Sequence, residues 1–522
     1  MDSGESPDTD TGDSAARTPA PGAAPPPRPR SAVVAALMLT MSLVALDGAV
    51  VSTAVPQIVG DLGGFAAFSW IFSGYILAAT VTLPVYGRLC DTHGRKPVLL
   101  LGIGLFLTGS LLCAAAWNMA ALIAFRVLQG LGGGALQGTV QTLAADLYPL
   151  EERPRIQARM SAVWATSALA GPALGGLISS YADWRWVFLL NLPPAAGALW
   201  IINRHLVERT RPPGRGGPVD WAGALGVFAC GAVLLFALVQ GGVTWPWVSA
   251  PSLGLLGAGA ALAVLVVRIE RRAEQPILPG WVWRRRTIAA VNLAMAALGL
   301  LMVAPMVFMP MYAQTVLGLG PTGAGLVTSA MTLSWPVSAA LAQHLYRRIG
   351  FRDTAATGVA LAAVILGSFT LLPYPAPVWQ PALVMLLLGG ALGLFQLPLI
   401  VGVQSTVDWA ERGTTTASVL FCRNVGQSVG AALLGAVANA TIAGRLADAP
   451  VPGLPAHLDD VAKALDQPHL LSPAAAEHLR RAVAAAGDHI FAGATAAAVA
   501  AALALLLMAP RRFPVLPEQR AD

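Results

Sequence analysis

Three charged residues stand inside long apolar stretches of the sequence, where a charge is costly. Asp47, Arg126 and Arg423 each lie within a run of about 20 or more mostly apolar residues. A charge at the centre of a bilayer costs at least about 2.5–3.5 kcal/mol, so a residue of this kind is a functional candidate by default. A carboxylate that can change its protonation is what proton coupling requires, whereas arginine keeps its charge. Asp47 is therefore the candidate proton carrier, and Arg126 is the candidate residue that pairs with it or modulates it.

Each of these charges also has a structural explanation. Asp47 and Arg126 would hold two helices together as a static ion pair, and that role is compatible with proton coupling. Arg423 is expected near one end of its apolar stretch, where a long side chain can reach the membrane surface with its charged group. A direct transport role of Arg423 and this anchoring role both remain open.

The composition indicates that the apolar stretches are membrane helices. Of the 522 residues, 56% are hydrophobic and 11% are charged, whereas an ordinary soluble domain has about 25% charged residues. A chain this long and this poor in charge cannot cover its surface with polar side chains in water. We therefore predict an all-α integral membrane protein.

Fourteen apolar segments are long enough to cross a bilayer. Cytoplasmic loops carry an excess of Lys and Arg, so these residues test the count. With the N-terminus inside, most of the 33 Lys and Arg fall in the tails and even-numbered loops. Apart from Arg126 and Arg423 inside the apolar stretches, the exceptions are Arg185 and four residues of a long loop over 445–486. Because the pattern never inverts along the chain, we predict a multi-pass protein of the cell membrane with both termini in the cytoplasm. The predicted spans are 31–59, 67–86, 98–116, 119–145, 159–180, 186–203, 220–240, 252–267, 288–314, 322–345, 354–373, 380–403, 416–441 and 487–509.

A weak internal repeat divides the chain. Leu89, Gly94 and Lys96 recur 256 positions later as Leu345, Gly350 and Arg352. Two six-helix halves separated by two inserted helices give this spacing, and parallel repeats are known in transporters. The long external loop over 445–486 is interpreted as a surface hairpin, with an external cap or partner site as the alternative. The predicted organisation is a disordered cytoplasmic tail (1–30), a first half (31–205), the inserted helices with their linkers (206–287), a second half (288–510) and a cytoplasmic tail (511–522).

Motifs with a physical rationale occur in the first half. In the loop segment Gly87–Lys96, Gly94 permits a tight turn, and Asp91 can face a helix N-terminus or an arginine of the other half. The alternative for this segment is a solvated basic loop that serves topology only. The segment Arg126–Gly134 places the arginine before glycines that let helices approach closely. In Gly171–Gly176 a proline removes a backbone donor and bends its helix.

In this order, the motifs resemble those of the fourteen-helix drug:proton antiporter family of the major facilitator superfamily, over residues 31–510. Leu46–Pro56 resembles the first-helix motif of that family, while Thr92 and Ser167 depart mildly from the pattern. The resemblance implies that Asp47 and Arg126 serve proton coupling and that the loop motif latches the outward-open state. It also implies that the proline motif marks antiporters. The loop motif comprises Gly87, Arg88, Asp91, Gly94, Arg95 and Lys96, and the antiporter motif comprises Gly171, Pro172, Gly175 and Gly176.

The resemblance implies proton-coupled export of hydrophobic or amphiphilic compounds, such as drugs, dyes or toxic metabolites, by alternating-access antiport. Exporters of lipids or of a native secondary metabolite, and a nutrient symporter on the same fold, are the alternatives. The lone deep acid favours neutral or singly charged lipophilic substrates. The two inserted helices hold no deep charge, and no transport chemistry is assigned to them.

Other function classes lack their sequence signals. No GxxxxGK[ST] or HExxH motif is present, and the GxSxG match at 426–430 lies inside a predicted membrane span, so neither ATP-driven transport nor an enzyme is expected. The four cysteines show no zinc spacing. The net charge of +6 comes without a basic-aromatic recognition module, so no nucleic acid partner is expected. We expect a monomer in the lipid bilayer that uses no cofactor, with protons and small lipophilic substrates as its ligands.

Overall fold

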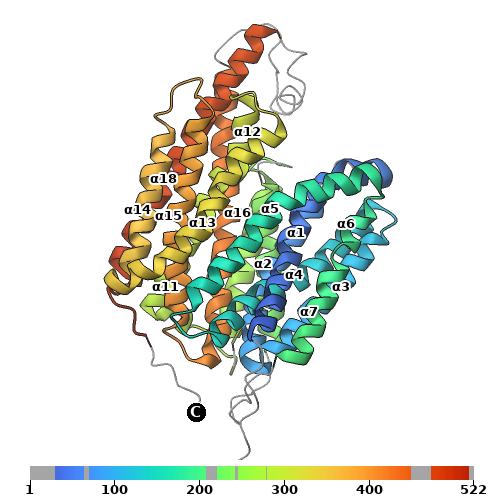
Figure 1. Cartoon of the computed structure of the whole chain (residues 1–522), viewed down its shortest axis with the longest axis vertical. Helices are drawn as coiled ribbons and strands as arrows, with labels where there is room; N and C mark the ends of the chain where they lie inside the picture. The colour runs from blue at the N-terminus through green and yellow to red at the C-terminus, as the bar shows by residue number, and fades with distance from the viewer. Residues whose placement is uncertain are drawn as a thin grey trace, which may run out of the picture.

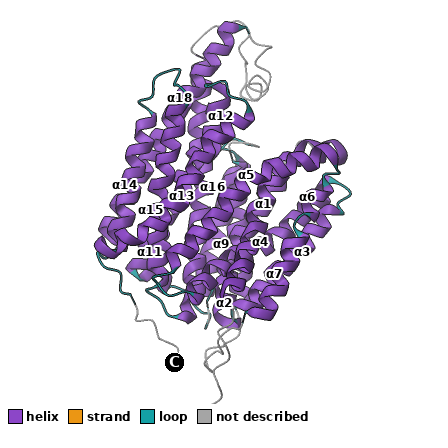
Figure 2. Cartoon of the chain, viewed as in Figure 1, coloured by secondary structure: helices purple, strands orange, loops and turns teal. Residues whose placement is uncertain are grey.

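The computed structural model describes residues 30–63, 70–206, 220–241, 245–274, 276–277, 279–447 and 472–515. In this part of the chain all regular secondary structure is helical, apart from an isolated β-bridge between Gly241 and Trp245 (Figure 2). The predicted N-terminal tail and the middle of the 445–486 loop lie outside the described residues. The helices of the first half are α1 (Arg30–Leu62), α2 (Trp70–His93), α3 (Arg95–Ala114), α4 (Met119–Leu147), α5 (Arg153–Tyr181), α6 (Arg185–Leu189) and α7 (Leu192–His205). The inserted pair is α8 (Trp221–Gln240) and α9 (Ala250–Glu270).

The second half begins with a short helix and an interrupted one. A π-helical turn over Ala304–Phe308, with Pro305 in it, joins α11 to α12. Proline removes a backbone donor, which accounts for the break in the regular helix. The helices are α10 (Trp281–Arg284), α11 (Arg286–Val303), α12 (Met309–Thr315), α13 (Pro321–Ile349), α14 (Phe351–Phe369), α15 (Trp379–Gln404), α16 (Trp409–Ala447) and α18 (Pro473–Met508).

The helices are long and apolar enough for a multi-pass membrane protein. Among the described residues, 12 segments meet the length and hydropathy needed to cross a bilayer. In two of them, α6 with α7 and α11 with α12, a pair of helices forms one segment. The long helices α5 and α14 fall outside this set, but they pack into the bundle against α1 and α15 respectively. The arrangement is compatible with the fourteen predicted spans, and the exact count stays a prediction.

The outer surface of the bundle is also apolar. Large side chains such as Trp200 (65% exposed), Leu333 (56%) and Val364 (71%) point outwards from three different helices. Exposed apolar surface spread over a whole bundle is expected where lipid, and not water, is the solvent.

Each half has an apolar core of its own, and the halves lie side by side (Figure 1). The halves contact each other through α2 and α4 with α16, and through α5 with α13 and α15. The inserted α8 packs against α2 and α16, so it sits at a boundary between the halves. Its partner α9 packs on α8, with Val266 of α9 beside Gly226 of α8.

The predicted repeat has a counterpart in the backbone. Gly94, between α2 and α3, has φ 95° and ψ 165°, and Gly350, between α13 and α14, has φ 90° and ψ 166°. Each amide donates to a carbonyl four residues earlier, at 3.1 and 2.9 Å. This conformation is essentially restricted to glycine. The tight turn expected at Gly94 therefore occurs once in each half.

Several helices are longer than the sequence predicted. Helix α2 runs to His93, so Gly87–His93 of the predicted loop is helical, and α16 and α18 differ most from their predicted spans. The helix expected over 416–441 spans Trp409–Ala447, and the one expected over 487–509 begins at Pro473. The extra turns carry polar residues, so an apolar run does not reveal them. Ser472 caps α18 by accepting a hydrogen bond from the Ala475 amide at 3.3 Å, with Pro473 at the first position. The start of α18 projects beyond the other helices (Figure 1), so both ends of the predicted 445–486 loop are helical.

Candidate functional site

Asp47 and Arg126 form a buried ion pair inside the first half. Asp47 lies on α1 and is 2% exposed, while Arg126 lies on α4 and is 1% exposed. The Arg126 Nη1 atom donates to Asp47 Oδ2 at 2.6 Å. The two residues singled out by the sequence are thus direct partners. Removal of one partner of such a pair costs about 3–5 kcal/mol, because it leaves an uncompensated buried charge.

Two amide side chains complete the surroundings of the Asp47 carboxylate. Gln129 donates from Nε2 to Asp47 Oδ1 at 2.8 Å, and its Oε1 accepts from Arg126 Nη1 at 2.7 Å. Asn191, at the start of α7, donates from Nδ2 to Asp47 Oδ1 at 3.0 Å. Asn191 also donates at 3.0 Å to Ser110 Oγ, which in turn donates to the Phe188 carbonyl. Three side-chain donors therefore meet at one carboxylate.

Arg126 is also bound to α2. Its Nε atom donates to the Ile71 carbonyl at 3.0 Å, and its guanidinium lies 4.5 Å from the centre of the Tyr75 ring. Contacts of this kind between a desolvated cation and an aromatic face contribute up to about 2 kcal/mol. Any movement of Arg126 is therefore transmitted to the backbone of α2 as well as to Asp47.

Sequence reasoning found the two charges but missed their uncharged partners. Gln129 belongs to the Arg126–Gly134 segment, but neither Gln129 nor Asn191 was assigned to Asp47 from the sequence. A usable signal for Gln129 was its position three residues after Arg126, which places both on one face of a helix. No comparable local signal marks Ser110 or Tyr75, which come from other helices.

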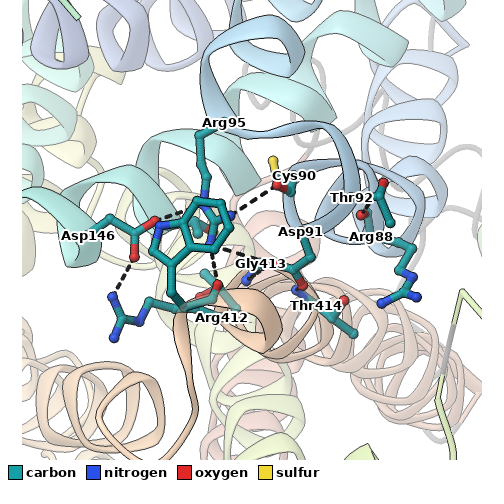
Figure 3. A network of polar contacts seen from close by, with 12 residues as sticks. Arg88, Cys90, Asp91, Thr92, Arg95, Asp146, Arg412, Gly413 and Thr414 are labelled. Carbon is teal, nitrogen blue, oxygen red and sulfur yellow. Dashed lines mark hydrogen bonds and ion pairs between the residues drawn. The ribbon is translucent and has the colours of Figure 1, made fainter. Parts of the chain in front are cut away.

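Asp91 links the two halves at the end of the bundle where α2 meets α3, here called the Gly94 end. Its Oδ1 accepts from the Gly413 amide at 2.8 Å, and its Oδ2 accepts from the Thr414 amide at 2.7 Å (Figure 3). Both amides belong to the first turns of α16, where the helix favours negative charge. A helix N-terminus of the other half was one of the two partners considered for Asp91.

Arg95 joins the same cluster. Its Nε atom donates to Asp146 Oδ2 at 2.8 Å, and its Nη2 atom contacts the Trp409 carbonyl. The guanidinium also lies 3.6 Å from the centre of the Trp409 ring. Arg412 donates to the other oxygen of Asp146, which therefore lies between an arginine of each half (Figure 3).

The remaining residues of the loop motif also lie at the Gly94 end. Gly87 lies so close to α16 that an added Cβ would collide with the Gly413 carbonyl and the Ala417 side chain. Lys96 donates from Nζ to the carbonyls of Asn203 and Leu206 at 2.9 Å, at the end of α7. Arg88 lies to the side of the cluster (Figure 3).

Further polar contacts between the halves gather near this end. Gln404 donates to the Gln141 carbonyl at 3.4 Å, and Gln343 donates to the Glu151 carbonyl at 2.7 Å. Together with the Asp91 and Asp146 contacts, they close the Gly94 end. The gating role predicted for the loop motif stays a prediction, but its residues lie where the halves are joined.

The antiporter-motif segment lies on α5 beside the ion pair. An added Cβ on Gly171 would collide with Ala49, two residues after Asp47, so α5 and α1 approach closely there. Gly175 is buried, while the side-chain surroundings of Pro172 and Gly176 lie outside what the structure describes. The motif therefore shapes the contact between α5 and the helix that carries Asp47.

Arg423 lies well inside α16 and not near its end, because the helix begins at Trp409. Its side chain is partly buried and donates to Asn424 Oδ1 at 3.4 Å. It makes no ion pair within the described part of the chain. The position argues against the anchoring role, which relied on a helix start near 416.

No group of three or more His, Cys, Asp or Glu side chains among the described residues could hold a metal ion. The buried polar groups of the first half form an ion-pair site, and the Gly94 end is a contact between the halves.

Comparisons with known proteins agree with a transporter and not an enzyme. Residues 37–431 match the model of the Major Facilitator Superfamily. Over 420 residues the chain is 32% identical to "Multidrug resistance protein 3" of Bacillus subtilis (strain 168), covering 80% of this chain and 81% of the relative. It is 32% identical over 427 residues to "Multidrug transporter protein MdtP" of the same organism (81% and 78% covered). It is 33% identical over 404 residues to "Efflux pump dotC" of Dothistroma septosporum (strain NZE10 / CBS 128990), with 76% and 69% covered.

Solved structures share the fold at low sequence identity. The human organic anion transporter MFSD10 has a TM-score of 0.61 and 16% identity, with 92% of this chain and 100% of that chain covered. The proton:xylose symporter XylE has a TM-score of 0.57 and 15% identity, with 93% and 97% covered.

Proposed function

The chain belongs to the major facilitator superfamily, and on that premise we propose that it is a proton-coupled exporter of hydrophobic or amphiphilic compounds. It is a multi-pass membrane transporter, and relatives named as multidrug transporters and efflux pumps support export as the direction of transport. The proton gradient drives it without a cofactor, and the monomer is the functional unit. Both termini face the cytoplasm of the cell membrane.

The buried pair of Asp47 and Arg126 is the observation that carries the proposal. Its 2.6 Å contact ties α1 to α4, while the Ile71 carbonyl ties α4 to α2. A proton on Asp47 removes the charge that holds Arg126 and turns a carboxylate acceptor into a partial donor. The arginine must then rearrange, and α1 and α2 lose a restraint on their positions. Protonation is thereby converted into movement of helices within the first half.

The contacts at the Gly94 end supply the other part of the cycle. With that end in the cytoplasm, Asp91 and Asp146 hold the halves together on the inside. A proton then reaches Asp47 from outside, and the inside contacts must break before it leaves. Alternating access follows, because the cluster on Asp91 and Asp146 cannot stay closed while the substrate is loaded from within.

Proteoliposomes test the proposal. Purified protein is reconstituted with ethidium and Nile red on one side, and a pH gradient of either sign is imposed. An antiporter moves dye towards the side of higher proton concentration, and reversal of the gradient reverses the flux. Flux of dye in the same direction as the protons contradicts export by antiport and supports a symporter instead.

Export of a native secondary metabolite is a second candidate within the same mechanism. One relative, 30% identical over 416 residues, is named "Acurin A biosynthesis cluster MFS-type transporter" from Aspergillus aculeatus (strain ATCC 16872 / CBS 172.66 / WB 5094). To find such a substrate, an extract of the cells that make this protein is added to the same proteoliposomes. The compounds that the proteoliposomes accumulate are then identified by mass spectrometry. A lipid substrate is tested in the same assay with labelled phospholipids.

A further inference from the structure

A cavity of about 370 Å³ lies where the inserted α8 meets both halves of the transporter. Its walls come from the start of α2 (Ser73, Ile76), the end of α8 with the segment after it (Leu238, Trp247) and the middle of α16 (Asn424, Gln427). The volume is within the range of about 300–1,000 Å³ that is typical of small-molecule sites. The cavity is separate from the Asp47 site, which is enclosed by the first half alone.

Aromatic contacts hold α8 in place over this cavity. Trp70 at the start of α2 stacks on Phe236 of α8 with ring centres 5.1 Å apart, and Phe236 lies 6.2 Å from Trp245. Trp247 packs so closely on Gly241 that a Cβ there would collide with its ring. The pair of α8 and α9, here called the inserted hairpin, is thus fixed to α2 at the end of the bundle away from Gly94. It forms one wall of the cavity.

The chemistry of the walls is amphipathic and uncharged. One face of α16 presents Asn424, Gln427, Ser428 and Asn439, whose spacing aligns them along the helix. Within the described part of the chain, the Gln427 and Asn439 side chains make no hydrogen bond and are exposed, so their amides are available to a ligand. The opposite wall is apolar and contains Leu235 and Leu238. The described residues that line the cavity include no acid and no base.

We propose that this cavity is a binding site for an uncharged amphiphile, with the inserted hairpin as its apolar wall. The polar part of the ligand hydrogen-bonds to the amides of α16, and the apolar part packs on Leu238 and Trp247. The proposal rests on the proposed function in that the ligand is taken to be a transported compound. It gives the inserted pair a role that the sequence did not assign to it.

The location also connects the cavity to the ion pair. Ser73, Ile76 and Leu77 line the cavity from α2, while Ile71 and Tyr75 of the same helix contact Arg126. At the cavity wall, Asn424 donates to Thr80 Oγ1 at 3.2 Å and so ties α16 to α2. A ligand that hydrogen-bonds to Asn424 in place of Thr80 loosens the contact between α16 and α2. It thereby shifts α2, the helix whose Ile71 and Tyr75 contact Arg126.

Two glycines provide a matched test of the site. Gly435 lines the cavity on α16, and Gly254 lies on α9 outside it. An added Cβ at either position meets nothing within 4 Å. Gly435→Phe is therefore expected to place its ring in the cavity, and Gly254→Phe is the control with the same chemical change. Both variants are expected to fold, because neither replaces a glycine with a positive φ.

The full-length protein in lipid nanodiscs is labelled with a nonionic alkyl glycoside that carries an aliphatic diazirine. Labelled peptides are mapped by mass spectrometry. We expect labels on α8 and on the 424–439 segment of α16, reduced about tenfold in Gly435→Phe, a difference of about 1.4 kcal/mol in binding. The label should be unchanged in Gly254→Phe. An alkyl trimethylammonium diazirine should label the segment less, since no acid faces it.

Equal labelling of the two glycine variants, or preferred labelling by the cation, overturns the proposal. Labelling is measured without a pH gradient, so it is independent of transport. If the site is labelled but no dye moves in proteoliposomes, the binding site stands and the proposed export function fails. If dye export proceeds but the 424–439 segment is unlabelled, export stands and the site fails.

Discussion

The two halves share a turn but differ in what surrounds it. Gly94 and Gly350 have nearly the same backbone angles, and the residue after each turn differs in kind. In the first half this residue is Arg95, which binds Asp146 and stacks on Trp409 of the other half. In the second half it is Phe351, whose ring stacks on Tyr346 with centres 4.6 Å apart.

A second pair of matched residues shows the same repeat. Lys96 donates to the Leu206 carbonyl just after α7, and Arg352 donates to the Ala509 carbonyl just after α18. In each half, a cation at the start of the third helix thus holds the end of the last helix. The scaffold is repeated, whereas the Asp47–Arg126 pair and the carboxylates that join the halves, Asp91 and Asp146, belong to the first half. The proposed proton coupling and gating therefore rely on acids of only one of the two repeats.

The largest expected effect is a difference in stability between variants of Asp91 and of Arg347, the residue that stands 256 positions later in the repeat. Asp91→Ala leaves the Gly413 and Thr414 amides without their acceptor and removes one ion-pair partner of Arg95, so the free energy of unfolding should fall by about 3–5 kcal/mol. Arg347 is exposed, and Arg347→Ala should change it by about 0.5 kcal/mol or less. Denaturant unfolding in detergent measures both values. Opening of the Gly94 end is read from alkylation of the buried Cys90, which should become faster only in Asp91→Ala. Equal losses of unfolding free energy and equal rates of Cys90 alkylation in the two variants would contradict this difference between the halves.

A smaller effect should be shared by the two halves. Gly94→Ala and Gly350→Ala both force a side chain into a conformation that glycine alone adopts easily. Each should lower the free energy of unfolding by about 1–3 kcal/mol. The two losses should agree within about 1 kcal/mol, since the backbone angles agree. A loss confined to Gly94→Ala would show that the turns are not equivalent.

The smallest effect concerns the two cations. Lys96→Ala and Arg352→Ala each remove a hydrogen bond from a side chain to carbonyls at a helix end, worth about 0.5–1.5 kcal/mol. Thermal unfolding in detergent should show a similar, small loss for both variants, and transport should persist. Loss of transport in Lys96→Ala alone would assign this residue to gating and not to the shared scaffold.

The sequence alone predicted the features that depend on composition and local spacing. Apolar runs located the helices, a tight turn was expected at Gly94 and the repeat matched this residue with Gly350, and the cost of buried charge picked out Asp47 and Arg126. The ends of α16 and α18 were wrong, because their polar turns look like loops in a hydropathy pattern. Ser110 and Asn191 could not be assigned to Asp47, because neutral polar residues are common and only the folded bundle brings them together. For the same reason, the cavity beside α8 left no trace in the sequence.

The most direct test of the central claim compares wild type with Asp47→Asn in proteoliposomes. Asparagine keeps the size of the side chain and an oxygen acceptor but cannot carry a proton. With ethidium on both sides and no pH gradient, the variant should still exchange dye. With a pH gradient imposed, it should no longer concentrate dye, whereas wild type should. If Asp47→Asn still concentrates dye against its gradient, Asp47 is a structural partner of Arg126 and the coupling proton is carried elsewhere.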